Sequence, residues 1–312
     1  MDARAEALDS TQATALRWLV GMQHAVTELN YKGVVAYLKN HQVESFQLFH
    51  ATKSGIEQER LVSMNSPLRE VIRDAEKVAC YFPDIKKVYV ENKPASRSIL
   101  VELPDDLAQL ARHYRVNLQG QEYVARRLSQ VIGIEPRDDY RYARLIWVDS
   151  ESKLPLKFEI LDEDGQTVEQ MVFTSMSVEE SIPREDLKPS IQADGFSWQT
   201  TQRTALSLGS LRWGLHNVPD GFQIVSYARL KRPPSDHDVE HILLSDGFSS
   251  VSIYIDPYNS DIASRPHSRR IGTISARSAK IGGYHVTVMG EVPDKTVQAI
   301  ANGLRPQDPP PP

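Results

Sequence analysis

The residues best suited to metal chemistry in this sequence are His237, Glu240 and His241, which form an H-x-x-E-H pattern. Two imidazoles at this spacing bind one zinc ion when a helix carries both on one side and a third ligand follows. Here two prolines precede the pattern, and the strand-like run ILLSDGF follows it directly. This context favours a loop that enters a strand, so the sequence predicts neither a metal site nor another cofactor.

Other catalytic signatures are missing from the sequence. It contains no nucleophile elbow G-x-S-x-G, no Walker A loop, no G-x-G-x-x-G and no C-x-x-C. The paired acids at 138–139 and 162–164 lie in turn-like contexts, where carboxylates commonly cap backbone amides. We therefore expect a protein that binds rather than catalyses, and a zinc hydrolase is the least favoured alternative.

A local excess of positive charge is the first feature that indicates binding. The whole chain carries a net charge of −5, yet no acidic residue occurs from Ile262 to Gly290. Guanidinium groups match carboxylate and phosphate oxygens, so this stretch predicts a docking surface for an acidic peptide or for lipid phosphates. An edge strand protected by charge explains it equally well. The candidate partner-binding residues are Arg265, Arg269, Arg270, Arg277 and Lys280.

Large apolar residues at alternate positions of the expected strands are the second such feature. The candidates are Phe46, Leu48, Leu145, Trp147, Leu156, Phe158 and Ile160. An apolar sheet face must be covered, and the favoured interpretation is a core packed under two helices. Because two helices are few for a large sheet, the alternative is a partly open concave face that accepts an acyl chain or an apolar peptide.

The elements that must position these residues begin with a helix predicted at 11–29. Strand-length runs separated by turn residues follow, with a short helix at 105–113 between them. Asp164-Gly165 is the expected hairpin turn between two of the later strands. The sequence thus predicts a large, unclosed antiparallel β-barrel over 11–180, with helices on its concave face.

A smaller α+β domain is predicted for 198–305, closed by a helix at 294–304. The intervening residues 181–197 are interrupted by prolines and acidic residues, so we expect a linker there. The fold class predicted for the whole chain is therefore α+β with two domains.

Composition excludes several protein classes. Of the 312 residues 40% are hydrophobic and 25% charged, as in ordinary globular proteins. Thirty-six basic against 41 acidic residues argue against a general nucleic-acid binder, and the single Cys80 excludes an intramolecular disulfide. The first ten residues show no secretory signal, so we expect a cytosolic protein or a processed, mature chain, with poorly ordered ends.

Specific sequence stretches add to this reading of the residues. WVDSESKLPLKFEILDEDGQTVEQMVF at 147–173 and LLSDGFSSVSIYI at 243–255 are the most distinctive. LNYKGVVAY at 29–37, VPDGF at 218–222 and VMGEVPDKTVQAIANGL at 288–304 agree in the same order. Together they resemble the RseB/MucB family of periplasmic sigma-factor regulatory proteins, over nearly the whole chain.

The resemblance implies an N-terminal domain similar to the lipoprotein carriers LolA and LolB, and a C-terminal domain behind a flexible linker. It implies a periplasmic, non-enzymatic protein that binds the periplasmic part of an RseA- or MucA-type anti-sigma factor and shields it from the site-1 protease DegS. Lipopolysaccharide or another acylated lipid is expected to trigger release, which induces the envelope-stress sigma factor. The sequence leaves a homo-oligomer open.

A periplasmic lipid or lipoprotein carrier is the alternative function, because it would use the same concave face. A carrier hands its cargo to an acceptor, whereas a regulator changes its affinity for a protein partner. The second domain favours the regulator, because a carrier needs only the barrel.

Overall fold

The chain forms two compact units in a computed structural model that describes residues 3–40, 42–65, 67–92, 103, 107–231, 237–257 and 267–307. Unit 1 contains 1–103, 114–135 and 143–200, and unit 2 contains 104–113, 136–142 and 201–312. The predicted domains were continuous in sequence. In the structure two short, early segments group with unit 2 instead.

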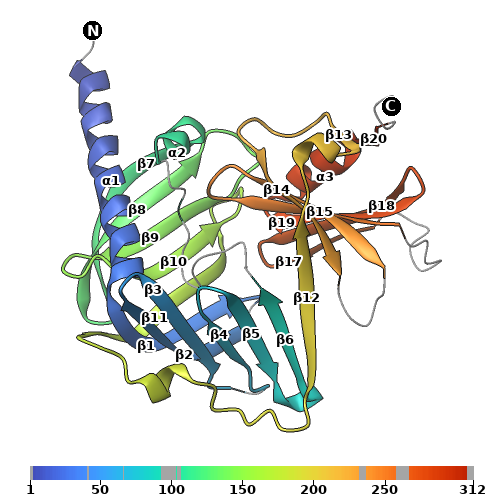
Figure 1. Cartoon of the computed structure of the whole chain (residues 1–312). Helices are drawn as coiled ribbons and strands as arrows, with labels where there is room; N and C mark the ends of the chain where they lie inside the picture. Colours follow the sequence, from blue (N-terminus) through green and yellow to red (C-terminus); the bar gives the residue numbers. More distant parts are fainter. Residues whose placement is uncertain are drawn as a thin grey trace. The chain divides into compact units, whose positions relative to one another are not determined.

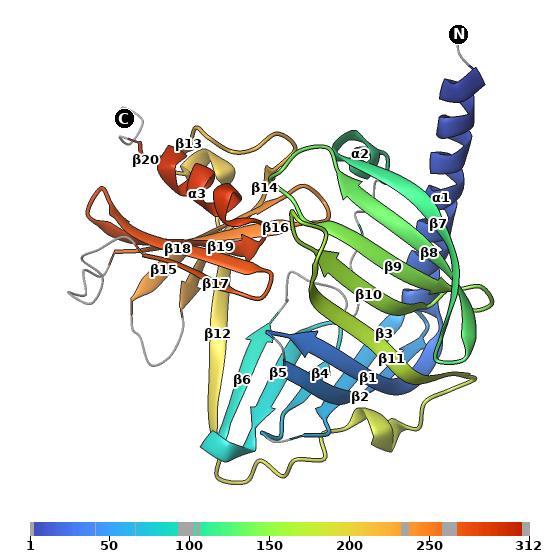
Figure 2. The same cartoon turned by 180° about the vertical axis from the view of Figure 1, so that it is seen from behind.

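Unit 1 is a strongly curved, open antiparallel sheet accompanied by a long helix (Figure 1, Figure 2). Its elements are α1 (Ala3–Glu28), β1 (Asn30–Lys39), β2 (Gln42–Lys53), β3 (Ile56–Ser63), β4 (Glu70–Arg73), β5 (Lys77–Phe82), β6 (Lys87–Asn92), β7 (Tyr114–Val124), β8 (Arg127–Pro136), β9 (Ala143–Asp149), β10 (Pro155–Leu161) and β11 (Thr167–Glu179). Pairing runs in the order β6, β5, β4, β3, β2, β1, β11, β10, β9, β8. Both views place β7 beside β8. This architecture, mostly β with few helices, confirms the predicted open sheet.

Helix α1 packs along the sheet through one apolar stripe. Leu19, Met22 and Val26 recur at helical spacing and are at most 4% exposed, and the helix contacts β7. Burying these side chains removes apolar surface from water, which stabilises the unit by roughly 25 cal/mol per Å². The helix begins at Ala3, earlier than the predicted Thr11, because ARAEALDS consists largely of strong helix formers.

Gly33 allows β1 and β11 to approach each other closely. A Cβ at this position would lie 2.4 Å from the Ser175 carbonyl oxygen and 2.7 Å from the Phe173 ring. Contacts this short do not occur for real side chains, so only glycine fits there. The glycine of the LNYKGVVAY motif therefore has a packing role.

The segment predicted as a linker is bonded to unit 1. It contains a 3₁₀ turn, Arg184–Leu187, and the Ser190 and Ile191 amides donate to the buried Glu70 carboxylate at 3.0–3.1 Å. Arg60 donates to Glu70 at 2.5 Å and to the Asp186 carbonyl at 3.0 Å. Charge-assisted hydrogen bonds of this kind hold residues 184–191 against β3 and β4.

Unit 2 is a second antiparallel sheet with a helix on one face. Its elements are α2 (Leu107–His113), β13 (Trp213–Leu215), β14 (Gln223–Lys231), β15 (Asp238–Ser245), β16 (Ser250–Asp256), β17 (His267–Ile271), β18 (Ile274–Ile281), β19 (Tyr284–Glu291), α3 (Asp294–Gly303) and β20 (Leu304–Pro306). β12 (Ser197–Ala205) begins in unit 1 and ends in unit 2. The sheet order is β12, β14, β15, β16, β19, β18, β17, and β13 pairs with β20. The helix predicted at 105–113 is thus α2, and it belongs to unit 2.

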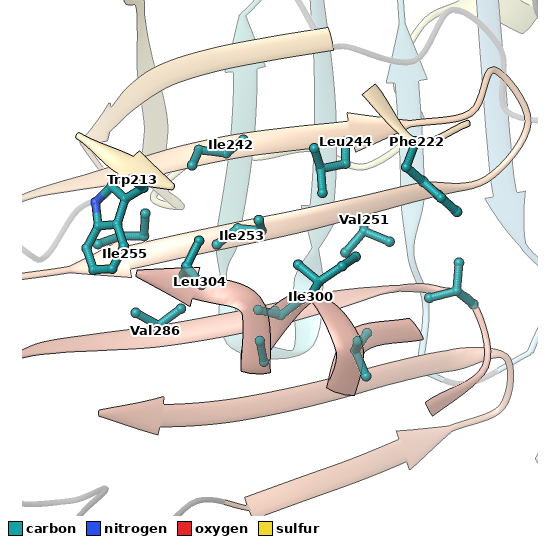
Figure 3. Packing of buried hydrophobic residues seen from close by; sticks show 14 of the residues in the cluster. Trp213, Phe222, Ile242, Leu244, Val251, Ile253, Ile255, Val286, Ile300 and Leu304 are labelled. Atoms are coloured by element: carbon teal, nitrogen blue, oxygen red, sulfur yellow. The ribbon is translucent and has the colours of Figure 1, made fainter. Parts of the chain in front are cut away.

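The core of unit 2 lies between this sheet and α3 (Figure 3). Alternate residues of the central strands, such as Ile242, Ile253 and Val288, are fully buried, and Val297 and Ile300 of α3 meet them. Apolar residues at every second position of the strands form one apolar face, and apolar residues at helical spacing in α3 form the other, so the two faces pack together. No helix in the described part of the chain is both long and apolar enough to cross a bilayer.

Candidate functional site

Five of the seven predicted lipid-binding residues lie on β2 and β10. Phe46 pairs with Val35 of β1, and Phe158 connects through Met171 of β11 to Tyr37 of β1. Directly paired residues point to the same side of a sheet, and positions two apart on a strand do so as well. Phe46 and Phe158 therefore share one face, which we call the apolar face. Leu48 and Ile160 extend it, two positions further along β2 and β10.

Leu145 and Trp147 lie on the opposite side of the sheet. Trp147 pairs with Lys157 and Leu145 pairs with Glu159, and both partners alternate with Phe158 along β10. The Trp147 indole donates to Glu122 at 2.8 Å, and the Lys157 ammonium lies 4.0 Å from the ring centroid. Polar and charged side chains thus cover this tryptophan. The structure does not bring these two residues together with the other five.

Burial divides the apolar face into a packed part and a partly open part. Leu48, Leu156 and Ile160 are at most 1% exposed, so they belong to the core. Phe46 and Phe158 are only half-buried. A site for an acyl chain on this face would be formed by these two phenylalanines and by two residues that the sequence analysis missed.

The missed residues are Tyr37 and Met171, which are half-buried between the two phenylalanines. Their signal in the sequence is weak, because each lies in a strand where apolar and polar residues alternate irregularly. Only the pairing register places them beside Phe158. The lipid-binding role of the whole face stays a prediction.

A buried polar row crosses β1 to β4 next to the apolar face. Tyr31, His50, Glu59 and Arg73 pair with one another in that order. The rings of Tyr31 and His50 stack at 4.6 Å, and His50 Nδ1 lies 2.8 Å from the Leu29 carbonyl oxygen. That distance assigns the ring proton to Nδ1, since a carbonyl only accepts.

Electrostatics of this row favour neutral forms for its two aromatic residues. Burial lowers the pKa of His50, although Leu29 and Glu57 oppose this effect, and Arg73 lowers it further. Burial also raises the pKa of Tyr31, with Glu59 and Glu57 adding to the shift. Glu59 lies 3.6 Å from Arg73, and this pair holds the charge in the row.

The candidate basic residues of unit 2 lie on two faces of the β17–β18 pair. Arg270 pairs with Ser275, two positions from Arg277, so these two arginines share the face that α3 covers. Arg269 pairs with Ala276, and Lys280 lies four positions along, so both point to the other face. Arg265 lies outside the described residues. The basic residues therefore do not form a single patch.

Two of these arginines differ in their surroundings. The Arg270 guanidinium donates to the Gly272 carbonyl at 3.1 Å and lies 5.8 Å from the Tyr142 ring centroid. Arg277 is half-buried and lines a groove of about 340 Å³. Arg277 is thus the member of the set that faces an open space in the fold.

The H-x-x-E-H residues are separated by strand geometry. His237 lies beside Asp256 at 3.1 Å, and His241 lies 3.0 Å from Ser252 and stacks on Tyr254. Glu240 instead accepts a hydrogen bond from Tyr227, and burial, together with this bond, raises the pKa of that phenol. In strand β15 neighbouring side chains point to opposite faces, which separates Glu240 from His241, and His237 precedes the strand, four positions away from His241. No cluster of potential metal ligands occurs within the described residues.

Arg141 joins the two distinctive motifs of unit 2. Its guanidinium donates to the Asp246 carboxylate at 2.5 Å and to the Asp220 carbonyl at 2.5 Å, and it also pairs with Asp138. The Phe222 ring lies 4.7 Å from the guanidinium carbon. VPDGF and SDGFSS are therefore structural turns around one buried cation.

The fold and these surfaces define a two-unit, mainly β protein with a partly open apolar face in unit 1 and an arginine-lined groove in unit 2. Two family models match it, the MucB/RseB N-terminal domain over residues 14–191 and the MucB/RseB C-terminal domain over residues 207–305. The chain belongs to the MucB/RseB family.

Curated relatives agree with this assignment. The sigma-E factor regulatory protein RseB of Escherichia coli K12 is 28% identical over 300 residues, covering 91% of this chain and 88% of that protein. The sigma factor AlgU regulatory protein MucB of Pseudomonas aeruginosa is 27% identical over 307 residues, covering 96% and 94%. The relatives are thus sigma-factor regulatory proteins.

Solved structures show the same fold. A Pseudomonas aeruginosa MucA/MucB complex superposes with a TM-score of 0.75 at 24% identity, covering 95% of this chain and 99% of that one. A crystal structure of MucB superposes with a TM-score of 0.68 at 24% identity, covering 95% of this chain and 98% of that one.

Proposed function

We propose that this protein is a periplasmic negative regulator of an envelope-stress sigma factor. In this role it binds the periplasmic region of a membrane-spanning anti-sigma factor and protects that region from the site-1 protease. The observation that supports this best is the match to both MucB/RseB domain models in order along one chain. MucB, a relative of the same fold, has been solved in complex with MucA.

A lipid signal would act through unit 1. Phe46 and Phe158 are half-buried and share a face with Tyr37 and Met171. Each methylene of an acyl chain buried there contributes about 0.8 kcal/mol, so a partly inserted chain is enough to drive binding. The lipid releases the partner only if the lipid binds the partner-free form of the protein more tightly. A lipid with equal affinity for both forms would not shift the equilibrium between them.

The partner would contact unit 2 through the basic residues of β17 and β18. Arg269 and Lys280 are exposed on one face, and Arg277 faces the groove on the other. Arginine forks recognise carboxylates, which suits an acidic protein segment. Such charges act mainly on the association rate and are screened by salt, with a Debye length of about 8 Å at physiological ionic strength.

The test combines the full chain with the periplasmic segment of the anti-sigma factor encoded in the same genome. Binding is measured by calorimetry, and DegS-type cleavage of the segment's parent anti-sigma factor is followed with and without this protein. We expect a complex that slows cleavage and that added lipopolysaccharide dissociates. A complex that leaves cleavage unchanged would overturn the protective role.

The carrier alternative has a separate readout. A carrier passes bound lipid or acylated lipoprotein to an acceptor protein or membrane, whereas the proposed regulator does not. Transfer of a fluorescent acyl probe from this protein to acceptor vesicles, without any complex with the anti-sigma segment, would favour the carrier.

A further inference from the structure

The groove beside α3 is formed by three elements of unit 2. Its lining residues are Arg277, Ala279 and Ile281 of β18, Ala301 and Asn302 of α3, and Arg305 of β20, around a volume of about 340 Å³. We call it the Arg277–Arg305 groove. Its walls are aliphatic, and its polar groups are two guanidinium groups and one carboxamide.

The two arginines of this groove have no counter-charge among the residues that the structure describes. Within the described part of the chain, no carboxylate lies within ion-pair distance of Arg277 or Arg305, and the Arg305 guanidinium donates to the Leu304 carbonyl at 2.7 Å. Other arginines of unit 2 differ. Arg212 faces Glu240 at 3.4 Å and Arg229 faces Asp238 at 3.5 Å. The groove therefore concentrates positive charge that the described part of the fold does not neutralise.

The C-terminal end of α3 borders the groove but does not cancel this charge. A helix C-terminus carries about half a negative charge, on carbonyl groups that lack a helical partner. In α3 the Gly303 carbonyl already accepts from the His216 amide, and the Ala301 carbonyl accepts from the Leu304 amide. The two full positive charges of Arg277 and Arg305 outweigh the partial negative charge that remains at this helix end.

The lining selects among anions. A guanidinium fork binds the two oxygens of a carboxylate in parallel, and the Asn302 amide supplies both a donor and an acceptor for a peptide backbone. Ala279, Ile281 and Ala301 leave room for a small aliphatic side chain. This combination fits an acidic residue followed or preceded by an aliphatic one in an extended peptide.

We propose that the Arg277–Arg305 groove is the subsite that binds an acidic side chain of the protein partner, an inference that rests on the proposed function. The occupant is a carboxylate-bearing segment of the anti-sigma factor's periplasmic region. The groove thereby determines which part of that region is held by unit 2.

The test uses a matched pair of double variants of the full chain. Arg277→Gln with Arg305→Gln empties the groove of charge, and Arg229→Gln with Lys231→Gln removes the same charge from exposed positions of β14, which have no part in the proposed binding surface. Affinity for the periplasmic segment is measured by calorimetry at low and high salt. Because the groove variant loses charge-assisted hydrogen bonds, we expect its affinity for the segment to fall by at least about tenfold. The matched control should lose much less.

A second measurement identifies the carboxylate. Each Asp or Glu of the segment is changed to its amide and combined with Arg277→Gln in a double-mutant cycle. One position should show coupling with Arg277, while the others are additive. Asp308→Asn in this protein serves as a further control, because that acid lies close in sequence to Arg305.

The outcomes separate this inference from the proposed function. If the unaltered protein binds the segment and the groove variant binds it equally well, the groove inference is wrong and the regulator stands. If the unaltered protein does not bind the segment, the proposed function itself fails. Loss of lipopolysaccharide binding in the groove variant, with segment binding unchanged, would assign the groove to phosphate and overturn the acidic-peptide proposal.

Discussion

Arg141 and Asp246 form a fully buried ion pair although 105 residues separate them in sequence. The carboxylate also accepts hydrogen bonds from the Phe248 and Ser249 amides at 2.9 and 2.6 Å. A buried charge of this kind is stable only while its partners are present.

Arg141→Met should therefore destabilise the protein strongly. Breaking one side of a buried pair leaves an uncompensated charge and costs about 3–5 kcal/mol. The free energy of unfolding in urea measures the loss. Arg229→Met is the matched control, because Arg229 and Asp238 form an exposed pair that contributes at most about 1 kcal/mol. Equal losses for both variants would contradict the structural role of Arg141.

Phe158→Gln should leave the fold intact and weaken lipid-driven release of the partner. Phe158 is half-buried on the apolar face, so a polar side chain there stays partly hydrated. Leu145→Gln is the control, because Leu145 is also half-buried but lies on the opposite face of the sheet. Release by lipopolysaccharide is measured for both. Equal responses of the two variants would leave the apolar face as plain core.

Leu156→Asp should unfold unit 1, in contrast to the change at Phe158. Leu156 is 0% exposed, and an unpaired charge placed in such a site is very costly. Circular dichroism and thermal denaturation show the difference. A folded Leu156→Asp protein would show that the site opens to water, contrary to the observed packing.

The stability of unit 1 should fall as the pH is lowered through the range of histidine titration. His50 has a lowered pKa in the folded state because it is buried, so the unfolded state binds the proton more readily. Stability from this group is complete above the unfolded pKa of about 6.5 and is lost as the pH falls from there toward the folded pKa. The groups around the ring are Tyr31, Glu57, Glu59 and Arg73.

His50→Asn tests this dependence, because the amide can still donate to the Leu29 carbonyl but does not titrate. Urea unfolding is measured between pH 8 and mildly acidic pH. We expect a smaller pH dependence in the variant than in the unaltered protein. An unchanged slope would show that other groups cause the acid sensitivity.

Glu70→Gln should expose the segment 184–191 to protease. The Glu70 carboxylate accepts from two backbone amides of that segment and from Arg60, and an amide side chain cannot replace all three bonds. Trypsin should cleave after Arg184 several times faster than in the unaltered protein, whereas Lys188 is followed by Pro189 and stays uncut. Glu44→Gln, which affects only an exposed pair with Arg69, should not change the rate.

Local patterns predicted the elements well. The helical spacing in 11–29 and 294–304 and the Asp164-Gly165 turn all correspond to observed structure, with Gly165 at a φ of 74°. These features depend on neighbouring residues only. The strand period also implied that Arg269 and Arg270 point to opposite faces, but the charge excess alone suggested one patch.

Local sequence patterns could not predict the pairing register of the strands or the contacts between residues far apart in the sequence. Nothing near Trp147 in the sequence says that Lys157, rather than Phe158, is its cross-strand neighbour, and one residue of slip moves a side chain to the other face. The same holds for Arg141, whose partner in β15–β16 is set by tertiary packing. The sequence therefore predicted which kinds of residue form the candidate surfaces, but only some of the residues that actually share a face.

The position of Arg141 in the chain also affects which fragments of the protein can fold and when unit 2 folds during synthesis. A fragment that starts at residue 198 contains Asp246 but not the segment 136–142, so its carboxylate would be buried beside the two amides without a cation. Such a fragment should be poorly stable unless a peptide covering 136–142 is supplied in trans. During synthesis Arg141 leaves the ribosome 105 residues before Asp246, so unit 2 completes its fold only after the chain has been extended beyond Asp246.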